Sequence, residues 1–107
     1  MNTPDKEDFR KYQRFPFRED ILIDGIKKTT SIDISEGGLY VSSIQHFEKD
    51  SIIDLSIPFR GEQLMLRGKV QYYEPGIGIG IQFIELNDKQ LIVIKEIIES
   101  IKKKFAV

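Results

Sequence analysis

Two short groups of residues in this chain stand out by the chemistry of their residue types and by their spacing. Arg10 and Arg14 stand in an R-x-x-x-R spacing, and Asp33, Ser35 and Gly38 stand in a D-x-S-x-x-G spacing. A guanidinium can make paired hydrogen bonds to phosphate oxygens. Each group alone is also common in proteins that bind no ligand. Two arginines four residues apart can simply be solvated on the surface. Asp and Ser form ordinary strand-to-strand turns in which glycine supplies a positive φ.

The positive charge of the first group is local. The whole chain has 16 basic and 17 acidic residues and a formal net charge of −1, which argues against a general polyanion binder. Residues 9–18 nevertheless contain Arg10, Lys11, Arg14 and Arg18 and no acidic residue, and acidic residues stand on both sides. A short basic patch bounded by acids suits a compact dianionic ligand better than a long polymer.

Composition excludes several other kinds of site. The 107 residues include no cysteine and one histidine, His46, so disulfides, thiolate metal sites and His-rich metal sites are excluded. No nucleophile motif or phosphate loop is present, and the Gly-rich stretch 76–80 does not open the helix of a βαβ unit. We therefore expect no metal, no cofactor and no enzymatic activity.

The chain also has no pattern typical of a membrane or secreted protein. No segment approaches the ~18 consecutive apolar residues of a membrane span. The first 15 residues are charged throughout and lack the apolar core of a signal peptide. We expect a cytoplasmic protein without membrane insertion.

Most of the chain has the pattern of β-strands. It contains eighteen isoleucines and seven leucines, and β-branched residues favour strands. Six strand-like segments with turn-rich connections lie between residues 17 and 86, with turns at Gly25, Gly61 and Pro75-Gly76. This arrangement favours a small antiparallel barrel or sandwich.

The end of the chain changes to a helical period. Asn87 is a plausible N-cap for an amphipathic helix over residues 88–105. We expect this helix to cover the open end of a barrel, and docking of a partner protein is the alternative. The apolar stripe, with spacings of three and four, consists of Leu91, Ile94, Ile98, Ile101 and Phe105.

In this order and context, the two groups resemble the motifs of the PilZ domain family, the bacterial receptor modules for cyclic di-GMP. The likeness includes residues 14–17 (RFPF) before the first strand, the signature turn at residues 31–39 (SIDISEGGL) and the closing Gly-rich strand at residues 78–83 (GIGIQF). It runs from about residue 9 to residue 105. It implies a mainly β fold, a six-stranded antiparallel β-barrel of the PilZ split-barrel type with a C-terminal α-helix.

The resemblance also implies which residues bind cyclic di-GMP: Arg10, Arg14, Asp33, Ser35 and Gly38. Arginine suits this ligand because it bonds phosphates, pairs with the O6 and N7 edge of guanine and stacks on purines. Asp33 offers an acceptor to the N–H edge of guanine, and Ser35 offers a hydroxyl. Gly38 permits a close approach of the backbone to the ligand.

Three further positions are weaker candidates. Lys11 can add charge near a phosphate, or it can simply be solvated. Tyr72 is placed where relatives often have an aromatic or an arginine near a base, and its alternative role is ordinary packing. Phe9 stands where a basic residue would favour a stacked pair of ligands, so it favours a single ligand.

By the same resemblance the chain is a non-catalytic sensor. We expect residues 1–8 to be a flexible tail before one PilZ-like domain over residues 9–107. Its motif-bearing lead, residues 9–16, is expected to be loose without ligand and to become ordered when cyclic di-GMP binds. The barrel is expected over residues 17–86. The ordered lead would change a surface seen by an unidentified effector protein, in a process such as motility, biofilm or exopolysaccharide control.

Two alternatives from other classes remain. Some PilZ relatives are protein-interaction adaptors that do not bind nucleotide, although they typically lack the arginines or the D-x-S-x-x-G, and both are complete here. A barrel that binds single-stranded nucleic acid needs a basic groove with a line of exposed aromatics. The aromatics here are spread over strand positions, so we expect neither DNA nor RNA as a partner.

Overall fold

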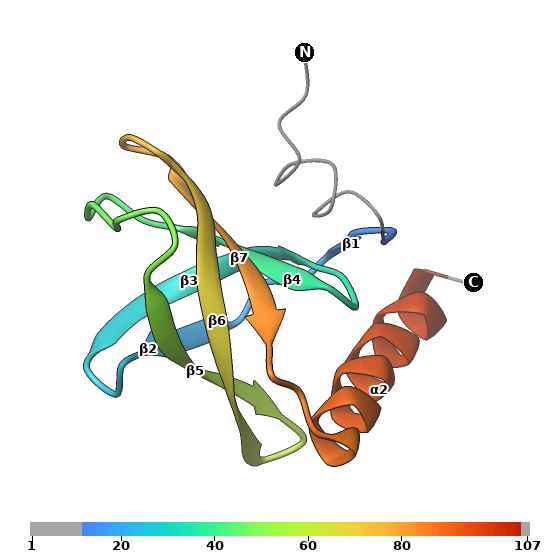
Figure 1. Cartoon of the computed structure of the whole chain (residues 1–107). Coiled ribbons are helices and arrows are strands. Elements are labelled where there is room, and N and C mark those ends of the chain that lie inside the picture. Colours follow the sequence, from blue (N-terminus) through green and yellow to red (C-terminus); the bar gives the residue numbers. More distant parts are fainter. Residues whose placement is uncertain (1–11, 106–107) are drawn as a thin grey trace.

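The computed structural model describes residues 12–105, in which seven strands precede one helix (Figure 1). The predicted tail, residues 1–8, lies outside this range. The elements are β1 (Phe15–Pro16), β2 (Asp20–Ile23), β3 (Lys27–Ile34), β4 (Gly38–Ser42), β5 (Ile52–Phe59), β6 (Glu62–Glu74), β7 (Gly78–Ile84) and α2 (Asp88–Phe105).

The strands form one antiparallel sheet that closes on itself. Their order is β1-β3-β2-β5-β6-β7-β4, and pairing between β3 and β4 completes the closure. Strands β2 to β7 make a six-stranded barrel, which confirms the predicted fold. The short β1 is an addition to it. Pro16 pairs with Asp33 of β3, so the last two residues of the predicted lead belong to the sheet in this structure.

Tight turns join the strands at the predicted glycines. Arg60 and Gly61, with φ of 51° and 78°, form a two-residue turn between β5 and β6. Positive φ at both positions gives the turn the twist that hairpin strands require. In the β6–β7 turn Gly76 has a φ of 74°, and the N–H of Ile77 donates to the carbonyl of Glu74 at 3.0 Å.

Alternate strand residues point inward and fill the barrel with branched aliphatic side chains. In β4, for example, Leu39 and Val41 join the core, while Tyr40 between them lies on the outer face. The strands contribute these core residues: Ile21, Ile23, Ile34, Leu39, Val41, Ile53, Leu55, Ile57, Leu66, Val70, Ile79, Ile81 and Phe83.

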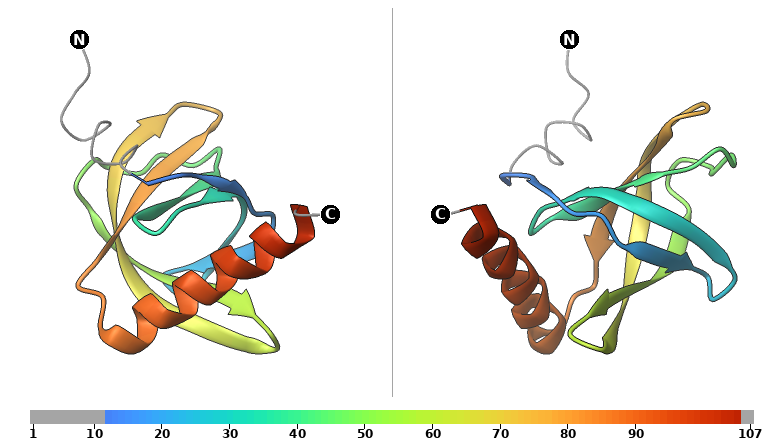
Figure 2. Two further views of the ribbon diagram at one scale, coloured as in Figure 1. Left: turned by 90° about the vertical axis from the view of Figure 1, so that its right-hand side faces the viewer. Right: turned by 180° about the vertical axis from the view of Figure 1, so that it is seen from behind.

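Helix α2 crosses one end of the barrel (Figure 2). Its residues Ile94, Ile97, Ile98 and Ile101 are buried in the same core as the strands, so the helix covers the barrel as expected. Ile97 was not part of the predicted stripe, because a spacing rule of three and four selects one residue per turn and the buried face is wider. The side chain of Phe105 lies outside the described residues.

The start of α2 is fixed by a reciprocal cap. The side-chain oxygen of Asn87 accepts the N–H of Gln90 at 2.8 Å, and the Gln90 side chain accepts the N–H of Asn87 at 2.8 Å. This capping box satisfies two backbone donors that a helix start leaves without partners. It confirms Asn87 as the N-cap. Within residues 12–105 no helix is long and apolar enough to cross a membrane.

Candidate ligand-binding face

The turn between β3 and β4 carries the second motif and is closed by Ser35. The Ser35 hydroxyl accepts the N–H groups of Gly37 and Gly38, each at 3.2 Å, and the Ser35 N–H donates to the Gly38 carbonyl at 2.9 Å. The Ser35 side chain is fully buried. In this structure it therefore shapes the turn, and a contact with a ligand remains a prediction.

The glycines of this turn serve a purpose that the motif alone did not suggest. Neither Gly37 nor Gly38 has a positive φ, so these glycines do not have the conformation that glycine supplies in an ordinary turn of this kind. Gly37 instead leaves room for an aromatic ring, since a Cβ there would lie 2.7 Å from the ring of Tyr12. Gly38 is buried and pairs with Gln82 of β7.

An ion pair joins the two motifs. Nη2 of Arg14 lies 2.6 Å from Oδ1 of Asp33, and Nε of Arg14 donates to the same oxygen at 2.9 Å. Both side chains are about one quarter exposed, at 24% and 27%. The register explains the meeting, because β1 starts directly after Arg14 and places Pro16 opposite Asp33. A residue 19 positions away in sequence is thus held beside the D-x-S-x-x-G turn.

A row of outward-facing residues continues from Asp33 across three further strands. Asp33 pairs with Tyr40 of β4, Tyr40 with Gly80 of β7, and Gly80 with Tyr72 of β6. The Tyr72 ring lies over Gly80 so closely that a Cβ at Gly80 would overlap it. The centres of the Tyr40 and Tyr72 rings are 6.0 Å apart. We call Arg14 and this row of four residues the motif face.

Tyr40 is the electrostatically unusual group of the motif face. Its hydroxyl donates to the carboxylate of Glu74 at the end of β6. Burial, followed by this hydrogen bond and the negative charge of Glu74, raises the pKa of Tyr40 well above its ordinary value. The phenol therefore stays protonated and keeps donating.

Comparison with known families decides where this architecture belongs. The family model of the PilZ domain matches residues 8–100, which include both motifs in full. The chain belongs to the PilZ domain family. PilZ domains form a family of cyclic di-GMP receptors.

Solved structures share the fold of this PilZ domain. The PilZ domain of CeSA from a cellulose-synthesizing bacterium is 23% identical with a TM-score of 0.65, over 84% of this chain and 98% of that one. The Bacillus subtilis inhibitor of motility, MotI/DgrA, is 18% identical with a TM-score of 0.71, over 91% of this chain and 51% of that one. A search of curated proteins finds no match.

The structure of this PilZ domain brings together some of the predicted site residues. Arg14, Asp33 and Tyr72 lie on the motif face, and Ser35 and Gly38 form the adjoining turn. Three predictions fall outside the described residues: Phe9, Arg10 and Lys11.

Sequence reasoning did not single out Tyr12, Tyr40 or Glu74. A signal for a close contact was present, because glycine inside a strand often marks a site where another group approaches the backbone closely. Gly78 and Gly80 are such positions. Which tyrosines would cover them depended on the strand register, and the sequence does not contain that information directly.

Proposed function

We propose that this PilZ domain binds cyclic di-GMP on the motif face and relays the level of this second messenger to a partner protein in the bacterial cytoplasm. Arg10 and Arg14 would bind the phosphates or guanines, Asp33 would accept from a guanine edge, and the turn of Ser35 and Gly38 would support the ligand. The domain would act by binding, without catalysis and without a cofactor.

The observation that carries this proposal is the ion pair between Arg14 and Asp33. Two motifs that are remote in sequence meet on one outer face of the barrel, beside two tyrosine rings. The Asp33 carboxylate fixes the direction of a guanidinium, which lowers the ordering cost when a planar ligand pairs with it or stacks on it.

The relay would start from the residue that follows Arg14. Phe15 packs against the core, and Nζ of Lys102 on α2 lies 5.6 Å from the centre of its ring. Because Phe15 and Pro16 already pair with β3 in this structure, we expect ligand-dependent ordering in the lead upstream of Phe15. A change in this segment is next to α2, on a surface that a partner can contact.

Calorimetry with cyclic di-GMP tests the proposal directly. The wild-type domain should bind, and Arg14→Ala should abolish binding while leaving the circular dichroism spectrum unchanged. Arg67→Ala is the matched control, since Arg67 contacts Asp54 and Glu85 outside the motif face. No heat from a folded wild-type domain would overturn the proposal and favour the adaptor that does not bind nucleotide. GTP and single-stranded RNA serve as competing ligands.

A further inference from the structure

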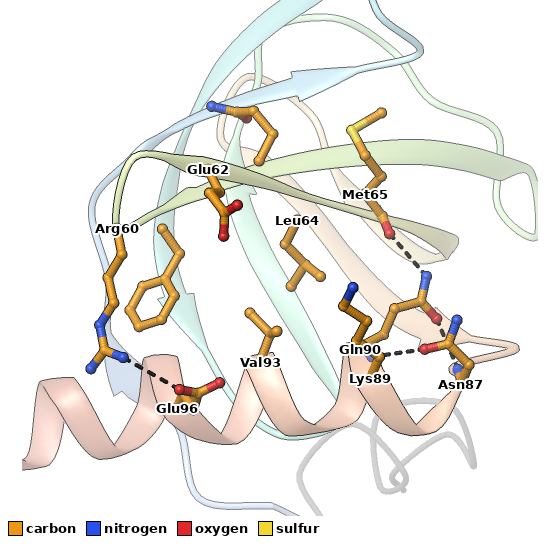
Figure 3. A pocket seen from close by; sticks show the side chains of 11 residues that line it. Arg60, Glu62, Leu64, Met65, Asn87, Lys89, Gln90, Val93 and Glu96 are labelled. Atoms are coloured by element: carbon orange, nitrogen blue, oxygen red, sulfur yellow. Dashed lines mark hydrogen bonds and ion pairs between the residues drawn. The ribbon is translucent and has the colours of Figure 1, made fainter.

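Two grooves border the line where α2 crosses the barrel. The first, of about 460 Å³, lies between the β5–β6 hairpin and the first half of α2 (Figure 3). The second, of about 420 Å³, lies between residues 16–19, the β5–β6 turn and the second half of α2. Arg60 lines both grooves and is ion-paired with Glu96 at 3.3 Å.

The first groove is electrically balanced. Two basic residues, Arg60 and Lys89, and two acidic residues, Glu62 and Glu96, line it. Figure 3 shows the Arg60–Glu96 ion pair at one end. Nothing in these charges selects one class of partner.

The second groove has an excess of positive charge. Arg60 on its rim is paired with Glu96, but Arg18 and Lys104 stand there against a single acid, Glu19. Neither Arg18 nor Lys104 forms an ion pair with another residue in the range 12–105. Phe17, Phe59 and Ile97 line it as well and add apolar surface to it. We call it the basic groove.

One wall of the basic groove is continuous with the motif face. The hydroxyl of Ser31 on β3 donates to the carbonyl of Phe17 at 2.6 Å and accepts the N–H of Glu19 at 2.9 Å. Two residues further along β3, Asp33 binds Arg14. The segment 14–19 therefore carries the motif arginine at one end and the wall of the groove at the other, fixed to the same strand.

We propose that the basic groove docks an acidic segment of a partner protein and that cyclic di-GMP on the motif face changes the affinity for that segment. Carboxylates of the partner would meet Arg18 and Lys104, and an apolar side chain would enter between Phe17 and Phe59. The dependence on cyclic di-GMP rests on the proposed function, whereas the docking itself does not.

An acidic peptide fits this groove better than a nucleic acid or a bilayer does. The site is a groove between three segments of the chain and is lined by two phenylalanines, so it suits a side chain that inserts. A phosphate polymer or an anionic bilayer would need a broader basic surface, because their binding relies on many cations at once. The formal net charge of the chain is −1.

Amide NMR spectra of the full chain test the docking with synthetic peptides. The probe is an amphipathic peptide of glutamates and leucines, compared with one peptide in which lysine replaces glutamate and another in which serine replaces leucine. We expect the acidic amphipathic peptide alone to shift amides of residues 17–19, 59–61 and 97–104. Arg18→Glu with Lys104→Glu should weaken it by about tenfold or more, and added salt should weaken it too.

Lys28→Glu with Lys95→Glu is the control, since it changes the net charge equally with exposed lysines that do not line the groove. Equal binding by the control and groove variants, or equal binding of the lysine peptide, would overturn the proposal. So would groove-dependent self-association in sedimentation. Groove amides that shift when Asp5, Glu7 and Asp8 are neutralised would identify the chain's own acidic residues as the occupant and would also overturn it.

Repeating the titration with saturating cyclic di-GMP separates the two proposals. A changed peptide affinity supports the coupling, and an unchanged affinity with bound nucleotide overturns the coupling alone. Peptide binding by a domain that never binds cyclic di-GMP supports the docking and rejects the proposed function. Binding of cyclic di-GMP without binding of the peptide supports the proposed function and rejects the docking.

Discussion

The motif face and the helix-covered end of the barrel are built from different interactions. At the helix-covered end, four isoleucines of α2 are almost completely removed from water, namely Ile94, Ile97, Ile98 and Ile101, and each such side chain stabilises the fold by roughly 1.5–3 kcal/mol. On the motif face the contacts are polar and partly exposed, namely the Arg14–Asp33 ion pair and the Tyr40–Glu74 hydrogen bond. Contacts of this kind contribute about 1 kcal/mol each.

This difference separates stability from recognition. The apolar end has one arrangement that buries its side chains, so it tolerates little change. The motif face can exchange an internal partner for a ligand at small cost, because each internal contact is weak. The variants below test this separation through their effect on the free energy of unfolding.

Truncation at the helix-covered end should have the largest effect. Ile97→Ala removes a side chain that is 1% exposed, and we expect a loss of about 2–5 kcal/mol because transfer and cavity costs add. Ile92→Ala, on the same helix at 57% exposure, is the matched control and should change stability by less than about 0.5 kcal/mol. Urea denaturation measures both, and equal losses would contradict the separation.

Crowding the aromatic row should have the next largest effect. Gly80→Ala places a methyl group against the ring of Tyr72, and overpacking of this kind costs about 1–3 kcal/mol. Tyr72→Ala removes the ring, so in its background Gly80→Ala should cost much less. A double-mutant cycle by urea denaturation measures this coupling, and additive losses would show that the ring does not hold this position.

Tyr40→Phe should cost about 1 kcal/mol at neutral pH, because Glu74 loses a hydrogen-bond donor. The pKa of Tyr40 is raised in the folded state, so the advantage of the wild type is fully present below the unfolded pKa of about 10 and is lost as the pH rises toward the folded value. Denaturation at several alkaline pH values measures the gap between the two proteins. If the stability difference between wild type and Tyr40→Phe grew above pH ~10, the pKa of Tyr40 would be lowered by folding and not raised.

Removal of the Arg14–Asp33 ion pair, which carries the proposed function, should change the free energy of unfolding least. Arg14→Ala should cost about 1 kcal/mol or less, since both partners are partly exposed and solvent screens them. The loss should shrink in high salt. Thermal denaturation at two ionic strengths measures it, and a loss as large as that of Ile97→Ala would show that Arg14 is chiefly structural.

The repeating patterns of the sequence were enough to predict the barrel and the helix. Alternation in segments such as residues 52–59 and the three-and-four spacing around Ile94 depend on local periodicity, and the periods of strand and helix differ clearly. Asn87 was predictable as a cap because capping is a local interaction with Gln90. The resemblance to PilZ domains supplied the closed form of the barrel.

The details of the motif face depended on contacts between residues remote in sequence. Pairing of β1 with β3, the ring of Tyr12 against Gly37 and the burial of Ser35 all follow from the register and packing of the closed sheet. A two-residue strand has no period to detect. The Arg14–Asp33 pair also has no local signal in the sequence, because its two residues are brought together only by the pairing of β1 with β3.

The closure of the barrel through β3 and β4 has a consequence for how copies of this domain behave when crowded. Open sheet edges invite other chains to add strands, which leads to aggregation and domain swapping. Among residues 12–105 the only sheet end outside the ring is β1, which is two residues long and includes Pro16, whose nitrogen has no hydrogen to donate. Such an edge offers few backbone groups with which another strand could pair, so the closed sheet protects this part of the domain against aggregation by strand addition.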